Sequence, residues 1–138
     1  MSKAVKTTAP GAPRRSPCPI SGTLDILGDK WTLLVIRDLF LGKRLFGEFL
    51  ESPEGIPTNI LAERLKRLET NGLIRREAYQ QRPLRHAYAL TRKGADLLPV
   101  LTEIMRWANA HVPGTLEPPD EVLARARAVR RKASRESD

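Results

Sequence analysis

The chain has 138 residues, and its 24 Lys and Arg against 16 Asp and Glu give a formal net charge of +8. This length is enough for one domain with a single core and too short for two. A basic balance favours nucleic acid or an anionic membrane surface as partner. The single cysteine excludes an intrachain disulfide, and no segment is apolar enough for a signal peptide or a membrane span, so we expect a cytoplasmic protein.

The N-terminal part of the chain predicts an arm followed by two helices. Residues 1–17 are basic and rich in Pro, Ala and Thr, which is typical of a flexible arm. Pro19 suits the first turn of a short helix that Gly28 ends. From about Asp29 to Gly42, side chains at helical spacing form a stripe in which only one member is polar: Trp31, Leu34, Val35, Asp38 and Leu39.

The middle of the chain predicts two more helices separated by a turn. Phe46–Leu50 is a brief helix, and the Pro- and Gly-containing segment Ser52–Pro57 cannot continue it. The next helix spans about residues 57–70 and ends at Asn71-Gly72. Its apolar side chains gather on one side, and the opposite side is polar: Ile60, Leu61, Leu65 and Leu68 form the apolar stripe.

The last third of the chain predicts a hairpin and two helices. Strands at residues 74–79 and 86–90 flank a polar tip that carries Arg82 and Arg85. Thr91 is expected to cap a long helix from about residue 92 to 111, kinked at Pro99. Residues 18–112 would form one domain with dimerisation helices, and residues 113–138 a basic, helical C-terminal extension.

This order of elements predicts a mainly α fold with a small β-hairpin wing, a winged helix-turn-helix that places one helix in the major groove of double-stranded DNA. Asn59 suits an adenine edge, whereas Lys and Arg suit phosphates or guanine. Arg64 projects near the apolar edge, so we expect it to brace the fold through an internal ion pair. The candidate DNA-binding residues are Lys43, Arg44, Thr58, Asn59, Ala62, Glu63, Lys66, Arg67, Arg82 and Arg85.

Several motifs resemble those of the HxlR-type regulators, which are MarR-like winged-helix proteins. The resemblance covers about residues 18–111 and implies a homodimer, built through terminal helices, that controls transcription by binding an operator. We expect a repressor and a pseudo-palindromic site. The motifs include Cys18-Pro, Leu24-Asp-Ile-Leu-Gly-Asp-Lys-Trp31, Leu45-Phe-Gly-Glu-Phe, Ile56-Pro-Thr-Asn-Ile-Leu, Gly72-Leu-Ile-Arg-Arg76 and Tyr88-Ala-Leu-Thr-Arg-Lys-Gly94.

Cys18 is a candidate redox or electrophile sensor, because a helix N-terminus and basic neighbours favour the reactive thiolate. Related regulators of the resembled family sense oxidants through a cysteine at this place. The alternative is a small apolar side chain packed under the first helix. Candidates for a dimer contact or for a small-molecule effector pocket are Trp31, Leu101, Ile104 and Trp107.

Other classes of function find little support in the sequence. No catalytic motif is present, so we expect no enzyme, and His86 and His111 lack neighbours at metal-ligand spacing, so we expect neither metal nor cofactor. Two alternatives to DNA binding stay open. The charges can be solvated surface groups, or the winged helix can dock on a protein without reading DNA.

Overall fold

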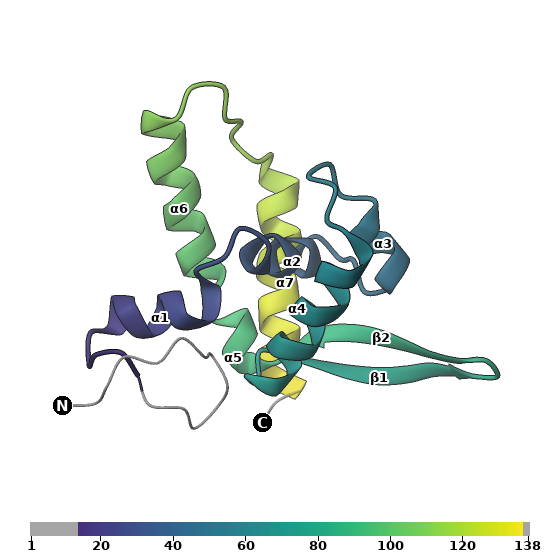
Figure 1. Cartoon of the computed structure of the whole chain (residues 1–138). Helices are drawn as coiled ribbons and strands as arrows, with labels where there is room; N and C mark the ends of the chain where they lie inside the picture. The colour runs from purple at the N-terminus through teal and green to yellow at the C-terminus, as the bar shows by residue number, and fades with distance from the viewer. Residues whose placement is uncertain (1–13, 137–138) are drawn as a thin grey trace.

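The computed structural model describes residues 14–136, so most of the predicted arm lies outside the described residues. Figure 1 shows the hairpin projecting from one side of the molecule, with α1 and α6 on the other. Except for the single helix predicted for residues 92–111, the elements form close to the residues that their patterns indicated. The elements are α1 (Pro19–Leu27), α2 (Thr32–Phe40), α3 (Phe46–Leu50), α4 (Thr58–Thr70), β1 (Ile74–Gln81), β2 (Leu84–Leu90), α5 (Arg92–Ala95), α6 (Leu98–His111) and α7 (Asp120–Glu136).

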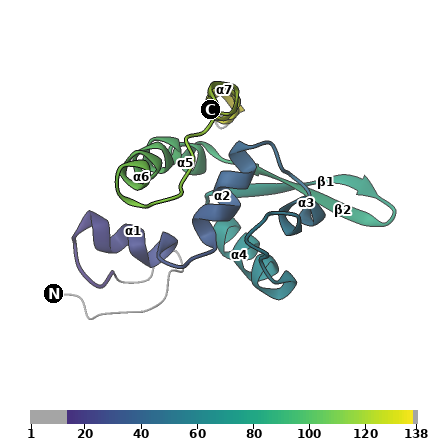
Figure 2. The ribbon, with the colours of Figure 1, turned by 90° about the horizontal axis from the view of Figure 1, so that it is seen from above.

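Helix α2 is the centre of the core. Seen from above in Figure 2, it lies between α4 and α7, and it contacts both. Because it is covered on two sides, more of its residues are buried than the predicted stripe contained, including Ile36 and Phe40. The predicted stripe of α4 is buried at Leu61, Leu65 and Leu68. The helix-turn-helix is therefore fixed to the core through α2.

The hairpin is longer and its turn tighter than predicted. The two strands pair antiparallel from Ile74–Leu90 at the base to Gln81–Leu84 at the tip, with an irregularity between Ala78 and Gln80. Ile74 and Leu90 are buried, whereas the tip is exposed. Backbone pairing thus continues beyond the part that the core holds, as expected for a wing that reaches away from the domain.

The single kinked helix predicted for residues 92–111 is wrong, because the chain forms two helices, α5 and α6. The Thr91 hydroxyl accepts from the Gly94 N–H at 3.2 Å and caps α5 as expected. Pro99 lies in the first turn of α6, where a helix needs no N–H, so it starts a helix there instead of bending one. Gly94 lets α5 approach the chain closely, since an added Cβ would lie 2.0 Å from the Leu73 carbonyl oxygen.

Helix α7 forms within the predicted C-terminal extension, and it packs against the rest of the molecule. Ala126 and Ala133 are buried, and Val129 packs beside them against the core. Their small side chains let α7 lie close against α2, α5 and β2. Within residues 14–136, no helix is both long and apolar enough to cross a membrane.

Candidate nucleic-acid interface

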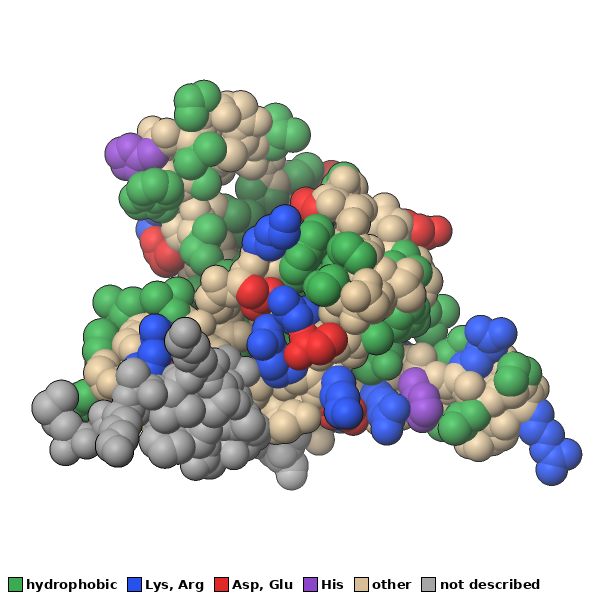
Figure 3. All heavy atoms as spheres, in the orientation of Figure 1, with side chains coloured by type: hydrophobic (Ala, Val, Ile, Leu, Met, Phe, Trp, Pro, Cys, Tyr) green, Lys and Arg blue, Asp and Glu red, His purple; other side chains and the backbone are tan. Residues whose placement is uncertain are grey.

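The outward face of α4 carries most of the residues predicted to read DNA. Thr58, Asn59, Ala62, Glu63 and Lys66 are all exposed, because the apolar stripe turns the other side of the helix toward the core. In the space-filling view, Lys and Arg side chains lie over this region and at the far end of the hairpin (Figure 3). Within residues 14–136, no side chain bonds to the Lys66 ammonium group, which leaves it available to an external anion.

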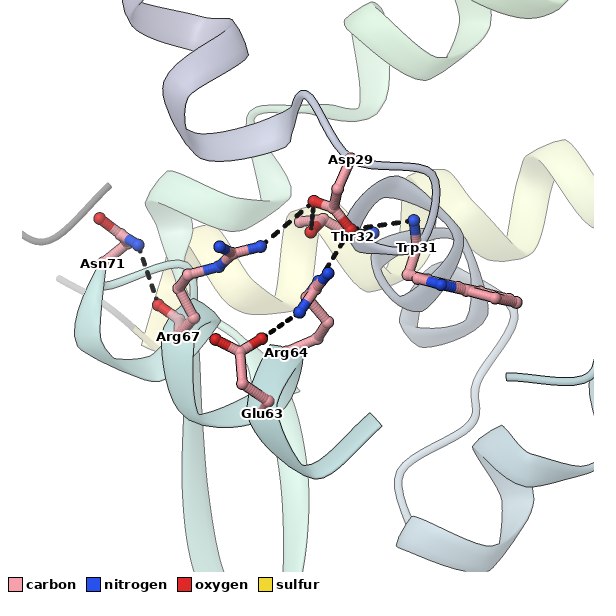
Figure 4. A network of polar contacts seen from close by, with 7 residues as sticks. All are labelled: Asp29, Trp31, Thr32, Glu63, Arg64, Arg67 and Asn71. Atoms are coloured by element: carbon pink, nitrogen blue, oxygen red, sulfur yellow. Dashed lines mark hydrogen bonds and ion pairs between the residues drawn. The ribbon is translucent and has the colours of Figure 1, made fainter. Parts of the chain in front are cut away.

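An Asp29-centred network fixes α4 against the start of α2 (Figure 4). Its carboxylate accepts from the backbone N–H groups of Trp31 and Thr32 at 3.0 and 3.1 Å. On the α4 side, the Arg64 Nε donates to it at 2.8 Å and an Arg67 NH2 group at 3.3 Å. The expected internal ion pair of Arg64 is therefore confirmed. Asp29 thus pairs with backbone N–H groups at the start of α2, which begins at Thr32, three residues later than predicted.

The pKa of Asp29 reports how strongly this network favours the carboxylate. Burial alone would raise the pKa. Hydrogen bonds from Arg64, Thr32 and the Trp31 backbone outweigh that effect and lower the pKa from 3.8 to about 2. Arg67, predicted to contact DNA, donates a hydrogen bond from one N–H group to the same carboxylate. Its role is thus divided between orienting α4 and any contact outside the protein.

A second buried network holds the turn between α3 and α4. The Asp38 carboxylate is almost completely buried and accepts from the Ser52 hydroxyl, which explains the one polar position in the predicted α2 stripe. The Lys43 ammonium group donates to the Ser52 Oγ at 2.7 Å. Arg37 joins Asp38 to Glu54 through ion pairs of 2.9 and 2.7 Å. Lys43, predicted to contact phosphate, is therefore turned toward this loop.

Ion pairs also fix the base of the wing. Arg44 contacts Glu77 at 2.5 Å, and Arg75 contacts both Glu77 at 2.9 Å and Glu136 of α7 at 2.7 Å. The neighbouring Arg75 and Arg44 guanidinium groups lower the pKa of Glu77. Arg82 and Arg85 at the tip are exposed, and among the described residues neither side chain has a hydrogen-bond or ion-pair partner.

The four candidates for a dimer or effector contact do not converge on one pocket. Trp31 and Leu101 are partly buried against the core. Ile104 and Trp107 are 45% and 63% exposed on α6. Apolar side chains are exposed on both α1 and α6 (Figure 3). We call these two exposed sets together the α1–α6 face and define it by Ile20, Leu24, Val100, Ile104 and Trp107.

Cys18 lies on the same side of the molecule, directly before α1, and its thiol is free and exposed. Arg15 is turned to Asp25 at 2.5 Å and to the Ser21 carbonyl. Among the residues that the structure describes, no three His, Cys, Asp or Glu side chains gather in a way that could hold a metal ion.

Sequence reasoning missed the carboxylates that orient the interface: Asp29, Asp38 and Glu77. One of them carried a usable signal, because Gly28-Asp29 directly before an apolar helix is a typical helix start. The ion pair between Glu77 and Arg44 joins residues 33 positions apart, and the hydrogen bond from Ser52 to Asp38 joins residues 14 positions apart, so no local pattern indicates them.

The fold resembles those of solved regulators. The structure of the reduced transcriptional regulator YodB from Bacillus subtilis matches with a TM-score of 0.60 and 33% identity, over 73% of this chain and all of that one. The redox regulator HypR in its oxidised form matches with a TM-score of 0.62 and 33% identity, over 68% of this chain and 97% of that one.

Curated relatives and a family model agree with this likeness. An HTH-type transcriptional regulator of Synechocystis is 44% identical over 84 residues, which are 61% of this chain. The chain spans 62% of the length of that relative. A model described as HxlR-like helix-turn-helix matches residues 26–115. The relatives named above are transcriptional regulators, and the solved ones share the winged helix-turn-helix fold. Since the family match covers well over half of the sequence, the chain belongs to the HxlR-like helix-turn-helix family.

Proposed function

We propose that this protein is a sequence-specific DNA-binding transcriptional regulator that acts as a homodimer on a pseudo-palindromic operator. The observation that carries the proposal is the outward face of α4, which combines exposed Asn59 and Lys66 with a helix braced at Asp29. A braced helix presents its side chains in one geometry, so base edges can be distinguished without a large ordering cost. We expect repression, because a bound dimer would cover the operator.

The two parts of the interface would do different work. Asn59 faces outward on the first turn of α4, where an amide can pair with the N6 and N7 edge of adenine. Arg82 at the wing tip suits the phosphate backbone or a minor groove. We therefore expect Asn59→Ala to relax sequence preference. Arg82→Ala should weaken binding to all sequences and reduce the slope of log affinity against log salt concentration by about 1.

This division of labour can be tested by titrating both variants with operator and random duplexes at several salt concentrations. Wild-type protein and Lys30→Ala, a charge removed from the exposed loop before α2, serve as controls. Equal losses on specific and random DNA for both Asn59→Ala and Arg82→Ala would contradict the assignment.

The α1–α6 face supports the dimer. Trp107 and Ile104 are large apolar side chains that a monomer would leave in water, and apolar patches of this kind mark protein contacts. Pairing two copies through this face would leave both α4 helices free for successive major grooves, about 34 Å apart. We expect Trp107→Glu to give a monomer in sedimentation and to weaken operator binding. A variant that stays dimeric would rule this interface out.

Selection of bound sequences from a random DNA pool tests the proposal as a whole. An enriched inverted repeat is the expected result. If folded, dimeric protein enriches no sequence, the chain is better explained as a winged-helix protein-interaction module, which would dock a partner through the Thr58–Arg67 face.

We further propose that the regulator responds to oxidants or electrophiles through Cys18. Its exposed thiol is open to reagents, and the similar protein HypR is a redox regulator. Since the chain has one cysteine, oxidation would join two subunits, form a mixed disulfide or give an adduct. Diamide should change the operator affinity of the wild type and leave Cys18→Ser unaffected. An identical response in both proteins would refute a sensing role.

A further inference from the structure

Helix α7 carries a stripe of arginines that the winged helix-turn-helix does not use. Arg127, Arg131 and Arg135 follow one another at intervals of four residues, about 6 Å apart along the helix. All three are exposed, and among residues 14–136 none of their guanidinium groups has a hydrogen-bond or ion-pair partner. We call these three residues the α7 stripe. They lie beyond residue 115, where the family match ends.

The α7 stripe borders an open groove between α7 and α5 with a volume of about 520 Å³. The charged residues that line it are Arg92, Asp96, Arg127, Arg130, Arg131 and Arg135. The single acid among them, Asp96, is paired with Arg130 at 3.3 Å. The groove therefore keeps a large excess of positive charge. The groove on the other flank of α7 differs, because there Arg44 and Arg75 are matched by Glu77 and Glu136.

Like charges at this helical spacing repel one another, so the stripe costs some stability until an anion neutralises it. Guanidinium groups bind phosphate through paired N–H donors and keep their charge at any physiological pH. Each step of a DNA strand rises about 3.4 Å along the duplex axis and also turns around it, so consecutive phosphates lie about 6–7 Å apart and arginines about 6 Å apart fall near consecutive phosphates. A phosphate backbone is the anion that this spacing fits.

The α7 stripe lies on the opposite side of the molecule from α4. Ala126 and Ala133 turn one side of α7 toward the core, and α2 lies between α7 and α4 (Figure 2). At about 100° per residue, the three arginines lie between about 100° and 180° around the helix from Ala126. They therefore point away from the core, and a duplex held by α4 does not reach them.

We propose that the α7 stripe is a second, sequence-independent DNA-binding surface, through which an operator-bound regulator holds the phosphate backbone of another duplex segment. This inference rests on the proposed function, because α4 must hold the first duplex. The regulator would thereby bridge two DNA segments. The face with α4 would bind one segment by its sequence, and the α7 stripe would bind the phosphates of the other.

The test uses the full chain and beads that carry an operator duplex from the selection experiment. Protein is bound to the beads, unbound protein is washed away, and a labelled duplex of random sequence is added at low salt. The test variant is Arg127→Gln/Arg131→Gln. The matched control, Arg125→Gln/Lys132→Gln, removes two charges from the same helix at positions that contact the Leu41 carbonyl and Glu136.

The wild type and the matched control should retain the labelled duplex, and the test variant should retain about tenfold less of it. The amount of protein on the beads should be the same for all three. Equal losses in the two variants, or no capture of labelled duplex by the wild type, would overturn the bridging proposal. Binding of polyglutamate to the stripe without binding of duplex would instead assign it to an acidic protein.

Absence of protein from the beads would count against the proposed operator function and not against the stripe. In that case the same variants are titrated with random duplex in solution. Arg127→Gln/Arg131→Gln removes two phosphate contacts, so the slope of its log affinity against log salt concentration should be smaller by about 2. The slope of the matched control should not change. An unchanged slope in the test variant would overturn the inference.

Discussion

Replacing Asp29 by Asn tests whether the network beneath α4 stabilises the fold as its geometry indicates. Lowering a carboxyl pKa from 3.8 to about 2 corresponds to about 2.5 kcal/mol of stabilisation. Some solvent still reaches the carboxylate, so we expect Asp29→Asn to lower the free energy of unfolding by about 1.5 kcal/mol at pH 7. Urea denaturation at a fixed protein concentration measures this loss.

The pH dependence follows from the direction of the pKa change. The folded-state pKa lies below the unfolded one, so the contribution of Asp29 is complete above about pH 4 and is lost as the pH falls toward 2. The difference between wild type and Asp29→Asn should therefore be constant from pH 5 to 8 by this linkage and shrink in acid. Glu69→Gln, which removes an exposed partner of Arg76, is the control and should change little. Equal urea midpoints for wild type and Asp29→Asn, or a gap that widens in acid, would refute the reasoning.

Two further changes test α5 by thermal unfolding, and Gly47→Ala in α3 is the control for the first of them. Gly94→Ala should destabilise the protein by about 2 kcal/mol, because the new Cβ meets the Leu73 carbonyl oxygen. Gly47→Ala, where a Cβ meets nothing within 4 Å, should stabilise α3 by up to about 1 kcal/mol. If both alanine variants changed the melting temperature alike, the close approach at Gly94 would not determine its stability change. Thr91→Ala removes the cap of α5 and should cost about 1 kcal/mol, and an unchanged melting temperature would mean that the cap contributes nothing.

Local patterns predicted the helix-turn-helix well, because each element there has its own signals. The apolar stripe of α4, the Pro and Gly residues before it and Asn71-Gly72 after it all lie within about 20 residues of one another in the sequence. The break between α5 and α6 was missed because Pro99 fits a kink and a helix start equally well from sequence alone. In the structure, where Pro99 starts α6, Gly94 of α5 lies close to the Leu73 carbonyl group, and no sequence pattern indicates this contact.

The orientation of individual side chains was harder to predict. Arg64 was expected in an internal ion pair, but its partner Asp29 lies 35 residues earlier. From its position on the predicted helix, Arg67 was expected to contact DNA. Only the tertiary structure shows that one of its N–H groups donates to Asp29. Exposed groups with no partner within residues 14–136, such as Lys66, Arg82 and Arg85, lie where the helical and hairpin patterns placed them.

The packing of α7 has a consequence for the order in which the protein is made and folded. Ala126 and Ala133 complete a core whose central helix, α2, is synthesised almost a hundred residues earlier. Until those alanines have left the ribosome, Leu39 and neighbouring side chains of α2 lack their cover, and Arg75 at the wing base lacks its Glu136 partner. The helices of the helix-turn-helix are thus made before the side of the core behind them can close, so the nascent chain acquires its full stability late in synthesis.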